Sequence, residues 1–107
     1  MLNIPSTNEL PIACSLSDRD LALRSEAVRR EFFTGAVERT EFESGYAFRF
    51  PADGEWETKI NEFVSTERHC CSFLRFDVTY EPGLGPIWLK LSGGQGVKQF
   101  IEATFLD

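Results

Sequence analysis

The residues best suited to chemistry lie in the segment 67–71, ERHCC, which supplies one carboxylate and two adjacent thiols. At about 100° per residue along a helix, Glu67, Cys70 and Cys71 fall on one face. The other members of that face are apolar: Trp56, Ile60, Phe63, Val64 and Leu74. A carboxylate at the centre of an apolar face needs a cation, a metal ion or several hydrogen-bond donors, because an unpaired buried charge is strongly destabilising. The spacing therefore predicts a buried Glu67 with a partner.

A metal site is the first interpretation of this group. Thiolates bind soft divalent ions such as Hg(II) and Zn(II), and a third sulfur from Cys14 with the Glu67 carboxylate would complete a three- or four-coordinate site. A disulfide between the adjacent cysteines is disfavoured, because neighbouring Cα atoms lie about 3.8 Å apart and a disulfide needs more than about 4.4 Å. We therefore predict Cys14, Cys70, Cys71 and Glu67 as metal ligands and assign no catalytic residue.

An internal ion pair is the second interpretation. Arg24, Arg49 or Arg75 could pair with Glu67, and the cysteines would then be inert core residues. The chain would be a non-catalytic protein-interaction or small-ligand domain, expected to form a homodimer or to bind a protein partner that the sequence does not identify. A thiol enzyme ranks third, because no base that could activate a thiol is found. His69 projects about 200° away from the carboxylate and is expected to face solvent.

The composition restricts the partners and the location. With 107 residues, 42% of them hydrophobic, the chain has enough apolar material for one core and one domain. A net charge of −6 and a pI near 4.8 argue against nucleic acid and anionic membranes as partners. No signal peptide or transmembrane segment is recognised. We expect a cytoplasmic protein whose three cysteines are reduced.

The elements that would position these residues follow from hydrophobic periodicity and turn signals. Residues 1–13 are expected to form an irregular arm, and residues 14–107 a single α+β domain. A capping box at Ser17 and Asp20 predicts a first helix that ends near Gly35. Residues 37–42 and 46–50 are predicted to form two strands of a β-hairpin with a turn at Ser44-Gly45.

The second half of the chain repeats this pattern. The helix that carries the cysteines is predicted over 55–71, followed by a hairpin over 76–80 and 86–91 and by a last helix over 97–105. The expected fold is α+β, a four-stranded mainly antiparallel sheet with helices packed on one face in the order α-β-β-α-β-β-α.

Three strings carry a family resemblance: ACSL at 13–16, GYAFRF at 45–50 and ERHCCSFLRF at 67–76. They resemble a small uncharacterised bacterial domain with an A-C-(T/S)-L start and an E-x-x-C-C-x-F-(F/L)-x-F centre. That domain occurs alone and after the metal-sensing part of some MerR-type regulators. The resemblance covers most of the chain from Ala13 onward, and it singles out Cys14, Glu67, Cys70 and Cys71.

The resemblance implies a role in metal handling. No DNA-binding segment is expected ahead of the domain. We therefore expect that the chain does not regulate transcription alone, and that it is a metal-binding accessory or a module whose cysteines only pack.

Overall fold

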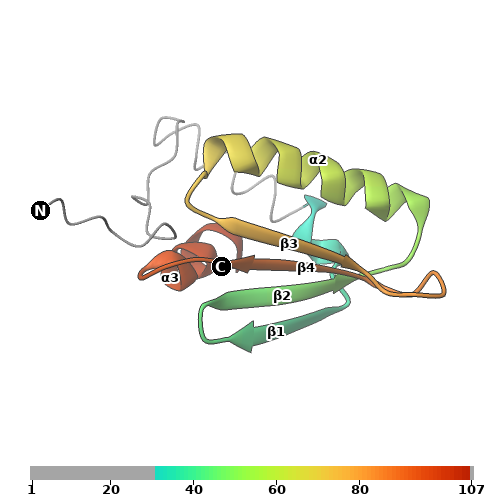
Figure 1. The fold of residues 1–107 in the computed structure, drawn as a ribbon, viewed down its shortest axis with the longest axis horizontal. Helices are drawn as coiled ribbons and strands as arrows, with labels where there is room; N and C mark the ends of the chain where they lie inside the picture. The colour runs from blue at the N-terminus through green and yellow to red at the C-terminus, as the bar shows by residue number, and fades with distance from the viewer. Residues whose placement is uncertain (1–30, 107) are drawn as a thin grey trace, which may run out of the picture.

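Four antiparallel strands form one sheet in the computed structural model, which describes residues 31–106 (Figure 1). The strands are β1 (Glu38–Phe42), β2 (Gly45–Phe50), β3 (Arg75–Tyr80) and β4 (Ile87–Ser92). Their order is β1-β2-β4-β3, so β2 and β4 form the centre and β1 and β3 form the edges. The α+β class and the antiparallel sheet are confirmed. The arm over 1–13 and nearly all of the expected first helix lie outside the described residues.

One face of the sheet, here called the core face, carries the large apolar side chains. Phe48 of β2 is paired with Leu89 of β4, which is paired in turn with Val78 of β3. Cross-strand partners point to the same face of the sheet. Along each strand, every second residue points to that face. The core-face residues of the two central strands, Tyr46, Phe48, Phe50, Ile87, Leu89 and Leu91, are all buried.

Helix α2 (Gly54–Cys70) lies along the sheet and ends at the candidate site (Figure 1). It begins where the Asp53 side chain accepts a hydrogen bond of 2.8 Å from the backbone N–H of Trp56. Its Phe63 ring lies 6.5 Å from the ring of Phe76 on β3 and 5.9 Å from that of Phe105. The prediction of a helix over 55–71 is correct to within one residue at each end.

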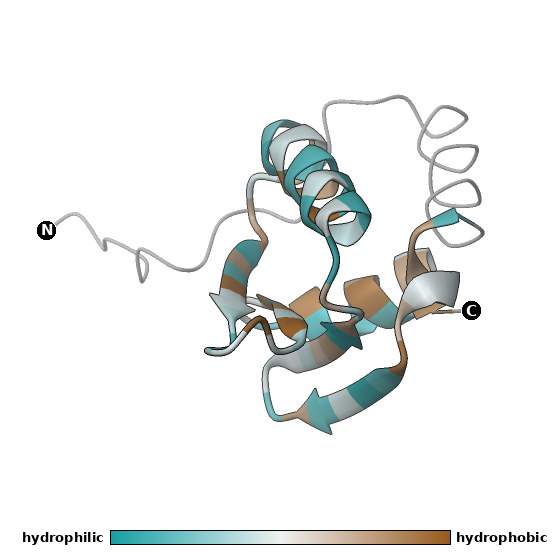
Figure 2. Ribbon diagram, turned by 90° about the vertical axis from the view of Figure 1, so that its right-hand side faces the viewer, coloured by the Kyte–Doolittle hydropathy of each residue, from teal (hydrophilic) through white to brown (hydrophobic). Residues whose placement is uncertain are grey.

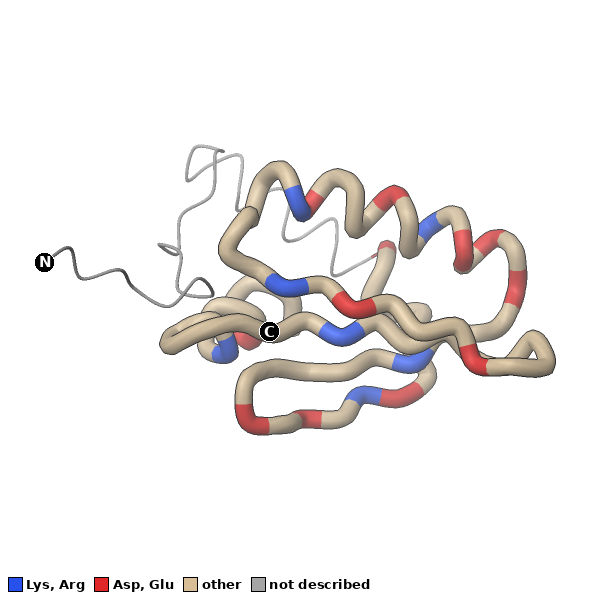
Figure 3. The backbone as a smooth tube through the Cα atoms, in the orientation of Figure 1, with Lys and Arg blue, Asp and Glu red and all other residues tan. Residues whose placement is uncertain are grey.

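Helix α2 carries charges of both signs. Its acidic positions outnumber its basic ones along the sequence (Figure 3). The outer turns of α2 are largely hydrophilic, whereas α3 and the strands carry hydrophobic bands (Figure 2). Within residues 31–106, no helix combines the length and the apolar character that a bilayer crossing requires.

The described part of the chain ends in two consecutive helical segments. Helix α3 (Val97–Ile101) passes directly into η2 (Glu102–Leu106), which has π-helical hydrogen bonding. A single helix over 97–105 was expected, so the change of helical type at Glu102 is a correction. Val97, Ile101 and Phe105 are buried and form the apolar stripe of these two segments. At the other end of the described chain, η1 (Phe33–Gly35) is a short 3-10 turn before β1.

Candidate metal site

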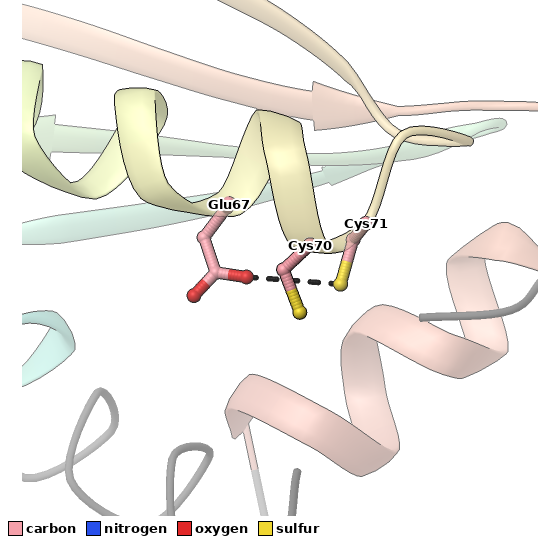
Figure 4. Close-up of side chains that lie close together, drawn as sticks. All are labelled: Glu67, Cys70 and Cys71. Carbon is pink, nitrogen blue, oxygen red and sulfur yellow. Dashed lines mark hydrogen bonds between the residues drawn. The ribbon is translucent and has the colours of Figure 1, made fainter. Parts of the chain in front are cut away.

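Helix α2 brings Glu67 into the core. The Glu67 side chain is 2% exposed, although it is a carboxylate on a surface helix. Cys70 is 6% exposed and Cys71 is fully buried. All three side chains project from the same side of the carboxyl end of α2 (Figure 4). The helical-face prediction for these residues is confirmed.

The three potential ligand atoms lie close together. One carboxylate oxygen and the two sulfurs are all within 4.8 Å of one another, and no other such group occurs in the described part of the chain. The Cys71 Sγ is 3.7 Å from Oε1 of Glu67. With bonds of about 2.3 Å to sulfur and 2.1 Å to oxygen, a tetrahedral zinc ion would hold such a pair about 3.6 Å apart. The spacing of this group could therefore hold one metal ion.

The end of α2 sets the position of Cys71. The sequence predicted that the helix continues through both cysteines, but Cys71 is the cap residue, with φ −122° and ψ 71°. Its backbone N–H still donates to the Glu67 carbonyl oxygen at 2.6 Å. The side chain thus leaves the helix at a non-helical backbone angle, and its thiol donates to the Glu67 carboxylate. This is a correction to the predicted geometry.

The burial of the carboxylate is compensated by hydrogen bonding. The Cys71 thiol donates to Glu67. No buried side-chain nitrogen or oxygen among residues 31–106 lacks a hydrogen-bond partner. Cys70 and Cys71 are both free thiols. The site therefore holds an acceptor and two sulfur donors, at least one of which is already directed at the acceptor.

The other predicted members of the site are placed as follows. Arg49 pairs with Glu38 at 2.9 Å, and it lies on the sheet face opposite to Phe48. Arg75 is exposed and pairs with Asp77 at 3.2 Å. The structure thus places both arginines beside other carboxylates. Cys14 and Arg24 lie outside the described residues.

His69 faces away from the site, as predicted. It is exposed, and its Nδ1 lies 2.7 Å from the carbonyl oxygen of Ser65 one turn earlier. A histidine next to two cysteines in the sequence is therefore no ligand in this geometry.

A second polar cluster was not predicted from the sequence. The Tyr46 hydroxyl donates to Glu102, and Lys98 pairs with Glu41 of β1. The hydrogen bond to Glu102 raises the pKa of Tyr46 to about 12, with burial and the negative charges of Glu102 and Glu41 as further causes. Lys98 and Glu102 lie one helical turn apart beside the apolar stripe. This spacing in the sequence could have indicated a polar cluster. The cluster ties the C-terminal helical segment to β1 and β2.

No protein-family model, curated protein or solved structure matches this chain. The functional interpretation therefore depends on the geometry described above.

Proposed function

We propose that this protein is a small cytoplasmic binding module for a thiophilic metal ion of the mercury or zinc class. Cys70 and Cys71 would bind as thiolates, Glu67 would be a further ligand or a hydrogen-bond acceptor, and Cys14 would supply a third thiolate. One observation carries the proposal: two sulfurs and a carboxylate oxygen lie within 4.8 Å of one another. The family resemblance singles out the same residues and supports it.

Charge balance favours a divalent ion at this place. A divalent cation would offset two of the negative charges that the thiolates and the Glu67 carboxylate bring to the site, so burying these groups around the ion costs much less than burying them as free anions. The protons of both thiols would be displaced on binding, including the one that Cys71 donates to Glu67. Metal uptake should therefore release protons and become tighter as pH rises.

The test is a titration of the reduced protein with Hg(II) and Zn(II), in which sulfur-to-metal absorption in the ultraviolet and bound metal per chain are both measured. Excess glutathione is added only where bound Hg(II) per chain is counted after removal of small molecules, so that binding to a single accessible thiol is suppressed, and it is left out of the absorption series. We expect one tight equivalent, lost in the double variant Cys70→Ala, Cys71→Ala and weakened in Cys14→Ala. His69→Ala is the matched control, because this exposed neighbour of the cysteines points away from the site, and its binding should be unchanged.

The competing function is a non-catalytic interaction domain, a homodimer or the binder of another protein, in which the cysteines only pack. The full burial of Cys71 is the observation in its favour. Thiol labelling of the native, metal-free protein separates the two functions. A metal site open to ions should react without denaturant, whereas core cysteines should react only after unfolding. No saturable metal binding by the folded protein would refute the metal proposal.

A further inference from the structure

A second candidate site lies at the junction of η1, β1 and the C-terminal end of the chain. It is an open pocket of about 520 Å³. Six of its lining residues are apolar: Phe33, Ala36, Val37, Phe48, Phe105 and Leu106. Thr34, Glu38 and Arg39 are the polar ones. We call it the Arg39 pocket. Small-molecule sites typically measure about 300–1,000 Å³ and combine apolar walls with few polar groups, so its size and lining suit a small ligand.

Strand register places Arg39 on the core face. Arg39 is paired with Phe48 across β1 and β2, and paired residues of antiparallel strands point to the same face. Glu38, the preceding residue, points to the opposite face, where it pairs with Arg49. A cation therefore stands beside aromatic walls, at the exposed edge of the sheet.

The carboxylates around Arg39 are already engaged. Glu38 is paired with Arg49, Glu41 with Lys98, and Glu102 accepts from the Tyr46 hydroxyl. Arg39 forms no ion pair with any carboxylate among residues 31–106. Its guanidinium is thus a bidentate donor without an anionic partner in the described part of the chain.

We infer that the Arg39 pocket binds a small amphipathic carboxylate, that is, an organic acid with an aromatic or aliphatic body. The carboxylate would accept two hydrogen bonds from the Arg39 guanidinium. The apolar body would lie against Phe33, Phe48 and Phe105. Arg39 disfavours a cationic ligand, because the guanidinium would repel it, and the Glu38 carboxylate is already paired with Arg49. The inference is independent of the metal proposal, since the two sites share no residue.

The test uses 1-naphthoate as the probe and its neutral analogue 1-naphthalenemethanol as the control ligand. Amide chemical shifts of the ¹⁵N-labelled full chain are followed during each titration. We expect saturable binding of 1-naphthoate, with shifts concentrated at Phe33, Phe48 and Phe105 and with weaker binding of the alcohol. Arg39→Gln should weaken 1-naphthoate roughly tenfold, as for the loss of a charge-assisted hydrogen bond, and should leave the affinity for the alcohol unchanged.

Arg75→Gln is the matched control variant, because Arg75 is an exposed arginine on the opposite edge strand. It should bind 1-naphthoate like the wild type. Arg39 is exposed, so the fold of Arg39→Gln should persist, and its amide spectrum verifies this. Equal affinity for the acid and the alcohol, equal effects of the two arginine variants, or no saturable binding would each overturn the inference. Unchanged metal binding by Arg39→Gln would keep this result separate from the metal proposal.

Discussion

Cys71 contacts Glu67 twice, with its backbone N–H on the Glu67 carbonyl oxygen and with its thiol on the Glu67 carboxylate. The first contact closes the last turn of α2, and the second directs a sulfur at the buried acceptor. Helix termination and the candidate ligand geometry therefore depend on the same residue. A change at either position should affect both the stability of the helix end and the properties of the site.

Glu67→Gln should lower the affinity for Zn(II) more than the affinity for Hg(II). Oxygen ligands suit Zn(II), whereas soft ions bind chiefly through thiolates. We expect Zn(II) affinity to fall roughly 10–100-fold, as for the loss of a ligand or of its supporting acceptor, and Hg(II) affinity to fall less. Competition titrations with a chelator of known affinity measure both. Glu62→Gln, an exposed change on the same helix, should alter neither. Equal losses for both metals would show that the carboxylate does not act as an oxygen ligand.

Cys71→Ala should destabilise the metal-free protein more than Cys70→Ala does. Removing the Cys71 thiol deletes a hydrogen-bond donor to the buried carboxylate, at a cost of about 1–3 kcal/mol in the free energy of unfolding. The loss for Cys70→Ala should be about 1 kcal/mol, that of an ordinary core truncation. Urea denaturation under reducing conditions measures both. Equal losses would mean that the bond between Cys71 and Glu67 contributes nothing to stability.

Tyr46 should make stability sensitive to high pH. Its pKa is raised from 10.0 to about 12 in the folded protein, so the neutral hydroxyl is favoured by folding. This contribution is fully present below pH 10, and it is lost as the pH rises through about 12. Phenolate absorbance, taken as the difference between the wild type and Tyr46→Phe, gives the pKa directly.

Glu102→Gln provides the control for this titration. It removes the main cause of the shift, so the pKa of Tyr46 should move back toward 10.0. An unchanged value in Glu102→Gln would assign the shift to burial instead.

Asp53 should stabilise α2 as its N-cap. Its side chain accepts from the Trp56 N–H, and replacement of an N-cap residue by Ala typically costs about 1 kcal/mol. Asp53→Ala should therefore lower the denaturation midpoint in urea. Asp53→Ser retains a capping oxygen and should restore most of the loss. Equal destabilisation by both substitutions would contradict a capping role.

The local features of the fold were readable from the sequence because they depend on short-range chemistry. Alternating apolar residues located β2 and β3, and the turn signals beside them located β1 and β4. The apolar face around Glu67 located α2 and the burial of the carboxylate. Both patterns follow from the geometry of isolated elements, and the other elements of the domain do not alter them.

The remaining features depend on contacts between distant segments. The pairing of β2 with β4 joins residues about 40 positions apart, and no local signal specifies it. Arg49 was a candidate partner of Glu67 because its charge is visible in the sequence, but the strand register placed it beside Glu38. The non-helical angle of Cys71 likewise depends on how the chain leaves α2 for β3.

The exposed edge of β1 carries its own protection against aggregation. Edge strands present unpaired backbone groups to which another chain could add a strand, and charged side chains discourage this. Four of the five residues of β1 are exposed, and three of them, Glu38, Arg39 and Glu41, are charged. Growth of the sheet by strand addition would bury these charges against a second copy of themselves. The β1 edge should therefore not pair with the β1 edge of a second copy, even at high protein concentration. Any self-association of this protein should use another surface.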